Sequence, residues 1–190
     1  MKVIKTKIEG LLTIEPRVFG DERGFFLETY NQEKYKEAGI KYDFLQDNLS
    51  KSAKGVLRGL HYQINPYAQG KLVYVIQGAI LDVAVDIRFG SPTFGQYMSV
   101  ELNEENKKQL WIPLGFAHGF ISLKDDTIFS YKCTNSYSPE SERGIMWNDP
   151  DLNTDWQMEK YRIDKPIISE KDQKNSAFKS IAKDFTYEEK

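Results

Sequence analysis

Three side chains suited to phosphate and proton chemistry lie in the run VLRGLHYQINPYAQGK, which spans residues 56–71. Arg58, His61 and Lys71 place two fixed positive charges and one titratable ring along one predicted strand and the start of the next. The chain has only two histidines, and the other, His118, lies in the run WIPLGFAHGF. Arginine and lysine bind phosphate, lysine also stabilises a developing oxyanion, and histidine transfers protons near neutral pH. The pattern indicates a small-molecule enzyme that acts on a phosphorylated ligand.

Each histidine also has a purely structural interpretation. His61 is flanked by Leu60 and Tyr62, so it could be a hydrogen-bonded histidine of the core. Arg58 and Lys71 lie nearby in the sequence, and burying either charge without an anionic partner costs free energy. Their presence therefore favours a functional site. His118 lies next to Gly119, where a small neighbour lets a ligand approach closely. The alternative for His118 is a stabilising role in a tight turn.

A metal site and a disulfide are not expected. Metal-binding β-barrels often use an H-x-H pair, but the run here is His61-Tyr62-Gln63, and glutamine is a poor ligand. Two histidines far apart, without clustered carboxylates or thiols, do not make a transition-metal site. Cys133 is the only cysteine, so an internal disulfide and a four-cysteine zinc site are excluded. One cysteine also fits a reducing cytoplasm.

Composition narrows the class of protein. The chain of 190 residues is most simply one domain, and its 26 basic and 28 acidic side chains give a net charge of −2. Nothing in this balance favours nucleic acid or an anionic membrane surface. No apolar run approaches the roughly 20 residues of a spanning helix, and residues 1–16 lack the pattern of a signal peptide. We expect a soluble, intracellular protein.

The elements that must position these residues are mainly short strands. Alternation and turn residues predict extended segments at 3–19, 25–30, 44–49, 56–63, 71–76, 80–87, 97–102, 110–113, 119–123 and 127–134. Gln77-Gly78 predicts a hairpin-type turn. Asn31 and Gly39 predict the ends of a short helix. Residues 178–185 have the spacing of a marginal amphipathic helix.

Strand parity raises a problem at the proposed site. Arg58 and His61 would point to opposite faces of a regular strand, because side chains alternate with a period of two. If both side chains serve one pocket, the strand is irregular between them, and Gly59 is the natural place for a bulge.

Many short strands with turns about every ten residues predict a β-sandwich or barrel. The chain has no βαβ alternation and no glycine-rich phosphate loop, so side chains must hold any phosphate. Three further residues stay undecided on local pattern alone. Tyr131 could be a packing residue, Asp172 a solvated residue of the tail, and Tyr137 either a surface aromatic or a stacking platform.

Several long segments carry a resemblance to a known family. In chain order they are EPRVFGDERGFF, FLQDNLSKS, VLRGLHYQ, QGKLVYVIQGAILDVAVDIR, SPTFGQY, QLWIPLGFAHGF, YKCTNSYSP, WNDP and SEKD. They run from about Glu15 to Asp172. In them the chain resembles the dTDP-4-dehydrorhamnose 3,5-epimerases, cupin-like enzymes of nucleotide-sugar metabolism.

The resemblance implies a fold, an assembly and a reaction. The expected fold is mainly all-β, a cupin-like jelly-roll sandwich or barrel with a few short helices. Residues 1–190 form one such domain, more irregular from about residue 139. The expected assembly is a homodimer without metal or other cofactor. The expected substrate is a dTDP-linked 4-keto-6-deoxyhexose, inverted at C3 and C5 to the precursor of dTDP-L-rhamnose, a component of cell-surface polysaccharide.

The family's catalytic roles transfer to four residues. His61 matches the base, and Asp172 matches its carboxylate partner. Tyr131 matches the acid that returns a proton to the opposite face of the sugar, and Lys71 matches the cation near the C4 oxygen. Both C3 and C5 neighbour the C4 ketone, so their protons are acidic and their removal gives an enolate.

The family's binding roles transfer to further positions. Around the diphosphate and sugar the matching residues are Arg23, Arg58 and His118. Polar groups that orient the nucleotide and sugar match Glu28, Gln46 and Asn48, and aromatic positions near the thymine match Phe19 and Tyr137. Glu142 and Lys171 match further ligand contacts. In the family a strand can cross to the partner subunit, so Arg23 and Phe26 are expected to complete the neighbour's pocket. The chain has Ser136 where relatives can carry a second aromatic.

Other functions stay open at this level. A 3-epimerase, a 5-epimerase or a ketoisomerase on a related nucleotide sugar would share the pocket and the base. A non-catalytic sugar-nucleotide binder of the same fold would bind without exchanging substrate protons. A metal-dependent oxygenase would contain bound iron.

Overall fold

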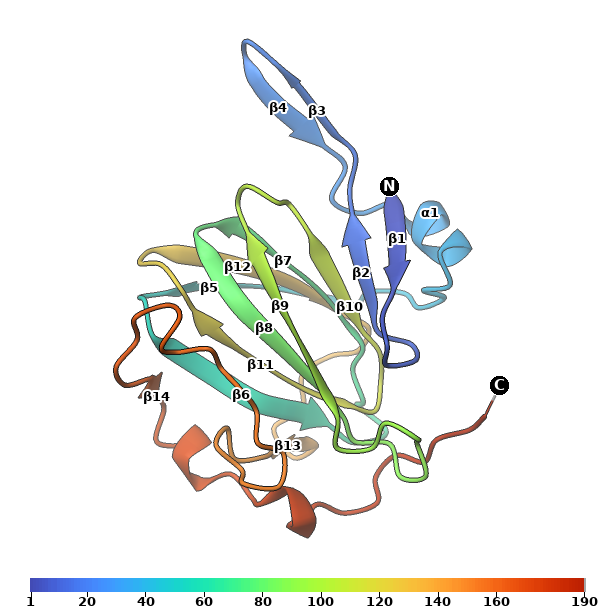
Figure 1. The fold of residues 1–190 in the computed structure, drawn as a ribbon. Coiled ribbons are helices and arrows are strands. Elements are labelled where there is room, and N and C mark those ends of the chain that lie inside the picture. The colour runs from blue at the N-terminus through green and yellow to red at the C-terminus, as the bar shows by residue number, and fades with distance from the viewer. Residues whose placement is uncertain (190) are drawn as a thin grey trace.

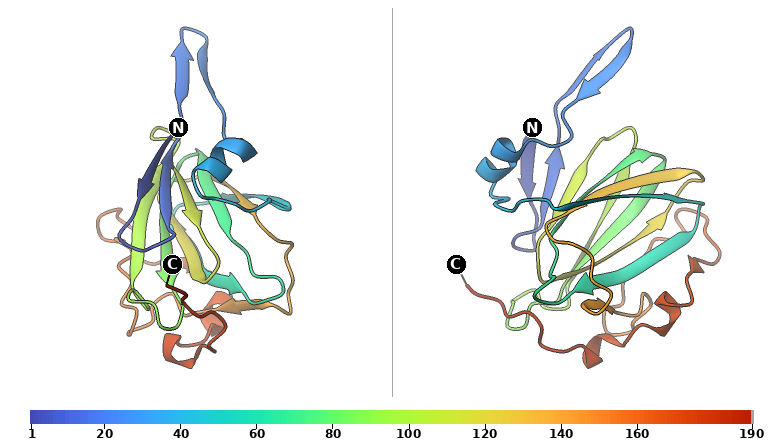
Figure 2. Two further views of the ribbon diagram at one scale, coloured as in Figure 1. Left: turned by 90° about the vertical axis from the view of Figure 1, so that its right-hand side faces the viewer. Right: turned by 180° about the vertical axis from the view of Figure 1, so that it is seen from behind.

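The computed structural model describes residues 1–189, which form two facing β-sheets with a hairpin that projects away from them (Figures 1 and 2). The first sheet has the order β1 (Lys2–Lys5), β2 (Leu12–Glu15), β10 (Gln109–Ile112), β7 (Lys71–Gln77), β12 (Thr127–Cys133) and β5 (Gln46–Ser52). The second has the order β13 (Glu142–Gly144), β6 (Val56–Gln63), β11 (Phe116–Ser122), β8 (Ala79–Asp86) and β9 (Tyr97–Asn103), with β14 (Ile167–Ile168) also paired to β6. The projecting hairpin consists of β3 (Val18–Asp21) and β4 (Gly24–Leu27). The predicted β-sandwich is confirmed.

The alternation in β8 explains why two layers pack on the second sheet. Ile80 and Ala84 belong to the core between the sheets, together with residues of β7, β10, β11 and β12. Leu81, Val83 and Val85 point to the other face, where the segment after residue 144 covers them with Leu152, Trp156 and Ile163. Because both faces are covered, every residue of β8 is buried. The irregular C-terminal part of the chain is therefore the outer layer of this sheet.

The short helix α1 (Gln32–Glu37) covers the outer face of the first sheet, where its Tyr35 packs on Ile14, Leu72 and Trp111. The predicted cap is confirmed, since the Asn31 side chain accepts a hydrogen bond from Lys34 N at 3.2 Å. The strand predicted for residues 25–30 is too long, because β4 ends at Leu27 and the chain then turns towards the helix.

The turn at Gln77-Gly78 is not a hairpin. β7 belongs to the first sheet and β8 to the second, so these residues carry the chain from one sheet to the other. Gly78 has φ +81° and lies against Thr127, where a Cβ would come within 2.4 Å of Thr127 Oγ1. The glycine that suggested a hairpin is therefore required by a close contact at the corner of the sandwich.

The predicted tail helix is also wrong. In the tail as far as residue 189, only single 3₁₀ turns form, η1 (Asp172–Lys174) and η2 (Phe178–Ser180). Phe178 stacks on Phe94, with ring centroids 5.1 Å apart, and Phe185 meets Tyr62 at 6.3 Å. The apolar side chains of the tail reach the body from a largely extended chain, so their contacts replace those of a helix.

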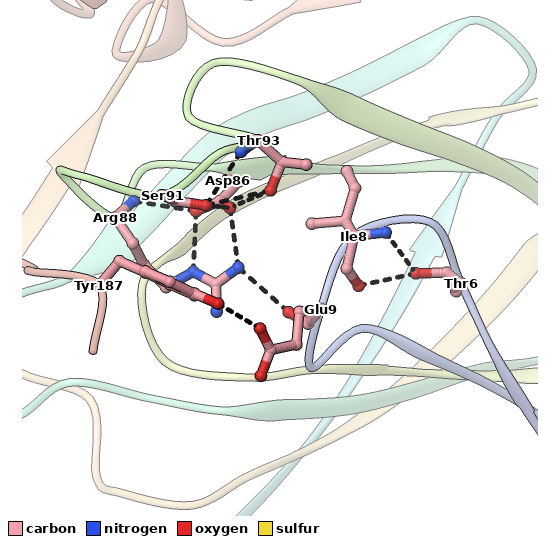
Figure 3. A network of polar contacts seen from close by, with 8 residues as sticks. All are labelled: Thr6, Ile8, Glu9, Asp86, Arg88, Ser91, Thr93 and Tyr187. Carbon is pink, nitrogen blue, oxygen red and sulfur yellow. Dashed lines mark hydrogen bonds and ion pairs between the residues drawn. The ribbon is translucent and has the colours of Figure 1, made fainter. Parts of the chain in front are cut away.

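A polar network closes the end of the sandwich where three distant segments meet (Figure 3). The Asp86 carboxylate is fully buried and accepts from Arg88 Nε at 2.9 Å and from Arg88 Nη2 at 2.7 Å. The guanidinium lies 4.7 Å from the centre of the Phe116 ring and 5.2 Å from that of Tyr187. The Tyr187 hydroxyl donates to Glu9, which ties the tail to the loop between β1 and β2. Within residues 1–189, no helix has both the length and the apolar character to cross a lipid bilayer.

Candidate active site

A cavity of about 490 Å³ is lined by both sheets and by the C-terminal segment. It brings together most of the charged and titratable residues that the sequence singled out: Arg58 and His61 of β6, Lys71 of β7, His118 of β11, Tyr131 of β12, and Lys171 and Asp172 of the tail. A second hollow of about 270 Å³ shares His61, Lys71 and Tyr131 with the first. It adds the predicted residues Gln46, Asn48, Tyr137 and Glu142.

The predicted irregularity in β6 is confirmed. The pairing register between β6 and β11 shifts between His118 and Phe120, opposite Gly59. Gly59 has φ +130°, and a Cβ there would lie 2.5 Å from the Cα of Gly119. The contact between these two glycines allows the side-chain alternation of β6 to shift by one residue. As a result, Arg58 and His61 both line the cavity.

His61 and Asp172 form a close pair. The distance from His61 Nε2 to Asp172 Oδ1 is 2.5 Å, and Asp172 is only 3% exposed. Burial raises the pKa of Asp172, but the hydrogen bond and charge of His61 and the Gly59 N–H outweigh it, so the pKa lies below its usual value. The ionised carboxylate holds Nε2 as its donor, which leaves Nδ1 of the imidazole as the basic nitrogen.

The pKa values of Lys71 and Tyr131 are shifted in opposite directions. Burial lowers the pKa of the Lys71 ammonium, and the acidic groups Cys133, Asp82 and Glu142 offset only part of this effect. Burial raises the pKa of the Tyr131 phenol, and Cys133 and Glu142 act in the same direction. Tyr131 therefore keeps its proton at neutral pH and can donate it.

His118 has a partner that the sequence did not reveal. Its Nε2 lies 2.9 Å from Asp82 Oδ2, and both residues are buried. Burial lowers the pKa of His118, positive charge on Lys71 and His61 lowers it further, and Asp82 opposes the change. One feature of the sequence could have indicated this partner: Asp82 lies on the face of β8 that points into the core between the sheets. A charged residue is rarely fully buried without a partner.

A chain of hydrogen bonds runs along the second hollow. The Tyr137 hydroxyl and Lys171 Nζ both donate to Glu142 Oε2, each at 2.5 Å. The amide N–H of Tyr137 donates to Gln46 Oε1 at 2.8 Å, and Gln46 Nε2 donates to Asn48 Oδ1 at 2.9 Å. These contacts hold the exposed Tyr137 ring beside the second hollow.

Arg58 has only one side-chain hydrogen-bond partner among residues 1–189. Its Nη2 makes a long hydrogen bond of 3.4 Å to Ser52 Oγ. It forms no ion pair with a carboxylate in the part of the chain that the structure describes. The guanidinium is thus available to an anionic ligand.

Four predicted binding residues do not reach the cavity of their own chain. Phe19 and Phe26 lie on the projecting hairpin and are 50% and 69% exposed. Arg23, at the tip of the hairpin, pairs with Asp21 at 2.6 Å. Glu28 pairs with Lys34 at 2.8 Å, beside α1. None of the four lines either hollow of the site.

A metal centre finds no support in the side chains. Among the 189 described residues, no three His, Cys, Asp or Glu side chains come together in a group that could hold a metal ion. Gln63, at the second position of the H-x-H pattern, instead donates to the carbonyl of Tyr67 at 2.6 Å and accepts from Ser138 N at 2.7 Å. It therefore anchors two loops.

A jelly-roll cavity that combines an imidazole–carboxylate pair, a protonated phenol and an ammonium defines an enzyme of the acid–base class. Comparison with known proteins gives the family. The chain belongs to the dTDP-4-dehydrorhamnose 3,5-epimerases, whose family model matches residues 5–180. The resemblance found in the sequence is thereby confirmed.

Individual relatives agree with this assignment. The dTDP-4-dehydrorhamnose 3,5-epimerase of Shigella flexneri is 57% identical over 90% of this chain and 93% of its own. A crystal structure of dTDP-6-deoxy-D-glucose-3,5-epimerase from Legionella pneumophila Philadelphia 1, in complex with dTDP-4-keto-L-rhamnose, superposes with a TM-score of 0.94. It is 49% identical and covers 99% of both chains. A 3'-monoepimerase from Streptomyces bikiniensis, in complex with dTDP-quinovose, has a TM-score of 0.84, 34% identity, and coverage of 92% and 87%.

Proposed function

We propose that this protein inverts C3 and C5 of dTDP-4-dehydro-6-deoxy-D-glucose and so produces dTDP-4-dehydro-L-rhamnose. Membership of the epimerase family supports the substrate class. The observation that carries the mechanism is the close pair of His61 and Asp172, in one cavity with Lys71 and Tyr131. These four residues supply a base, its carboxylate partner, a cation and an acid.

In the proposed first step, His61 removes the proton from C3 or C5. The C–H electron pair moves into the bond to C4, and the ketone becomes an enolate with its charge on the C4 oxygen. Lys71 stabilises this oxygen, because a preorganised ammonium in a site shielded from water lowers the energy of the developing charge by a few kcal/mol. Asp172 stabilises the imidazolium that forms on His61.

In the second step Tyr131 returns a proton to the opposite face of the same carbon. The raised pKa of Tyr131 keeps the phenol protonated until the enolate accepts its proton. His61 then releases its proton to water and Tyr131 takes one up from water, so the second carbon reacts by the same route, since C3 and C5 both neighbour C4. Inversion requires acid and base on opposite faces of the ring, and they come from strands of different sheets, β6 and β12.

The nucleotide end of the substrate is assigned to the remaining cations and to the second hollow. Arg58, His118 and Lys171 line the cavity as donors for diphosphate and sugar oxygens. Gln46, Asn48 and Glu142 provide polar contacts, and Tyr137 stacks on the thymine. One aromatic contact of this kind contributes roughly 1–3 kcal/mol. Because Ser136 replaces a possible second aromatic, stacking rests on Tyr137.

The hairpin is assigned to the pocket of a second copy of the chain. Phe19 and Phe26 expose large apolar rings at the hairpin, and large exposed apolar side chains that gather together are typical of interaction sites. Arg23 would bring a guanidinium to the partner's diphosphate site. Glu28 would add a polar contact there. A homodimer in solution that is lost when residues 18–27 are replaced by a short loop would support this assignment, and an active monomer would refute it.

The decisive experiment is proton exchange in heavy water with dTDP-4-keto-6-deoxyglucose as the substrate. We expect deuterium at both C3 and C5, and an L-sugar product. His61→Ala should lower the exchange rate about 10²-fold or more, the contribution of one general base. A variant with near-wild-type exchange would remove His61 from the mechanism.

A single epimerase is the second candidate, favoured by the structural match to a 3'-monoepimerase. Such an enzyme would incorporate deuterium at C3 alone. A non-catalytic binder would incorporate none while still binding the nucleotide sugar.

A further inference from the structure

The segment that carries Asp172 is fixed to the second sheet at both of its ends. At its start, Ile167 and Ile168 of β14 pair with Val56 and Leu57 of β6. At its end, Met146 N donates to the carbonyl of Ser176 at 2.9 Å, and Ser176 N donates to the carbonyl of Gly144 at 3.3 Å. Residues 169–175 thus form a bridge over β6, and Asp172 reaches His61 from the middle of it.

The far end of this bridge rests on a glycine. Gly144 of β13 pairs directly with His61 in the ladder between β13 and β6. The Asn175 side chain lies on Gly144 so closely that a Cβ there would be 2.2 Å from Oδ1, 2.4 Å from Cγ and 2.6 Å from Nδ2 of Asn175. Its φ is outside the left-handed region, so Gly144 is required for space and not for backbone conformation.

Asn175 is held by packing and not by hydrogen bonds. Its Nδ2 is buried and finds no acceptor among residues 1–189. Burying an unpaired amide is unfavourable, so the side chain stays in this place only because the backbone hydrogen bonds of Ser176 hold the chain beside Gly144. Asn175 directly follows the 3₁₀ turn of residues 172–174. The distance between Asn175 and Gly144 therefore sets the distance between this turn and β6.

We propose that Gly144 is a positioning residue of the reaction, which acts through Asn175 on the distance between Asp172 and His61. This inference rests on the proposed role of the Asp172 carboxylate in the epimerase mechanism. An added methyl group at residue 144 displaces Asn175, because the chain bonded to it is the bridge itself. The bridge rises, and Asp172 loses its 2.5 Å contact with His61.

The test is Gly144→Ala, measured by deuterium exchange with dTDP-4-keto-6-deoxyglucose. We expect kcat to fall about 10- to 100-fold, the size of effect that a displacement of about 1 Å in a catalytic group produces. KM should change less than about twofold, since Arg58 and His118, on strands separate from the bridge, still hold the diphosphate and sugar. Asn175→Ala in the same chain makes room for the methyl group, so Gly144→Ala/Asn175→Ala should recover most of kcat.

A variant at the other side of the contact covers the case in which Gly144→Ala does not fold. Asn175→Gln enlarges the side chain above an unchanged Gly144, and it should lower kcat in the same way. Thermal unfolding of each variant shows whether it is folded. An unchanged kcat in Asn175→Gln, or a loss in Gly144→Ala that Asn175→Ala does not relieve, would overturn the inference.

A double-mutant cycle separates this inference from the proposed function. With Asp172→Asn as the background, Gly144→Ala should have little further effect, because the contact that it breaks is already weakened. A further loss of the full size would show that Gly144 acts by another route. If Asp172→Asn alone leaves exchange unchanged, the proposed role of the His61–Asp172 pair fails, and the inference about Gly144 fails with it.

Discussion

Replacing Asp172 by asparagine removes one charge from the centre of the proposed mechanism while keeping the shape of the side chain. Asp172 is 3% exposed and lies 2.5 Å from His61 Nε2, so water cannot substitute for it. A hydrogen bond to a charged group contributes about 1.5–3 kcal/mol, against about 1 kcal/mol for a neutral one. In the transition state the imidazole becomes positive, so replacing the carboxylate by a neutral amide should raise the barrier by the difference, about 0.5–2 kcal/mol.

A barrier change of this size corresponds to a fall in kcat of about 2- to 30-fold. The assay is the loss of the proton NMR signals of C3 and C5 of dTDP-4-keto-6-deoxyglucose in heavy water. Asp151→Asn is the matched control, because Asp151 also forms a short ion pair, at 2.6 Å to Lys179, but on the surface. If Asp172→Asn exchanges both protons at the same rate as the control, the carboxylate does not assist the base.

Three further outcomes follow from the site and the network at the end of the sandwich. Tyr131→Phe should slow net inversion at least 10²-fold but slow deuterium exchange less, because His61 can still remove and return a proton on its own face; equal losses would contradict the separate acid. Lys71→Arg should extend activity to higher pH while lowering kcat at neutral pH, since burial lowers the pKa of Lys71 and a guanidinium keeps its proton; an unchanged alkaline limb in the pH profile of kcat would argue against Lys71. Asp86→Asn should destabilise the fold by about 3–5 kcal/mol at pH 7, measured by chemical unfolding. Despite burial, the hydrogen bonds from Arg88 lower the pKa of Asp86, so its contribution is present above the ordinary carboxyl pKa of about 4 and is lost as the pH falls through the lower folded value; a destabilisation equally large at pH 3 would contradict this origin.

Local sequence pattern predicts those parts of the fold that depend on the chain's own periodicity. The alternation in β8 correctly separated the two faces of that strand, because one face packs between the sheets and the other under the tail. Parity likewise predicted the break at Gly59, since Arg58 and His61 cannot otherwise face one cavity. Both arguments use only neighbouring residues.

Pattern fails where distant segments decide the structure. Phe178 and Phe185 have helical spacing, yet each packs on a different part of the body from an extended tail. Gln77-Gly78 looks like a hairpin, but nothing in the pair shows that the next strand joins the other sheet. Asp172 lies 111 positions from His61, and only the resemblance to a family connected them. Neither the local pattern nor the resemblance to a family predicted the role of Asp82, because its partner His118 comes from a different strand.

The projecting hairpin has a consequence for mixtures of subunits. Under the proposed exchange of hairpins, every pocket takes His61 from one chain and Arg23 from the other. A His61→Ala chain joined to an Arg23→Ala chain then has one pocket with both defects and one pocket with neither. Two inactive preparations should complement each other when they are mixed and allowed to exchange subunits, and a chain without its own base would still activate its neighbour.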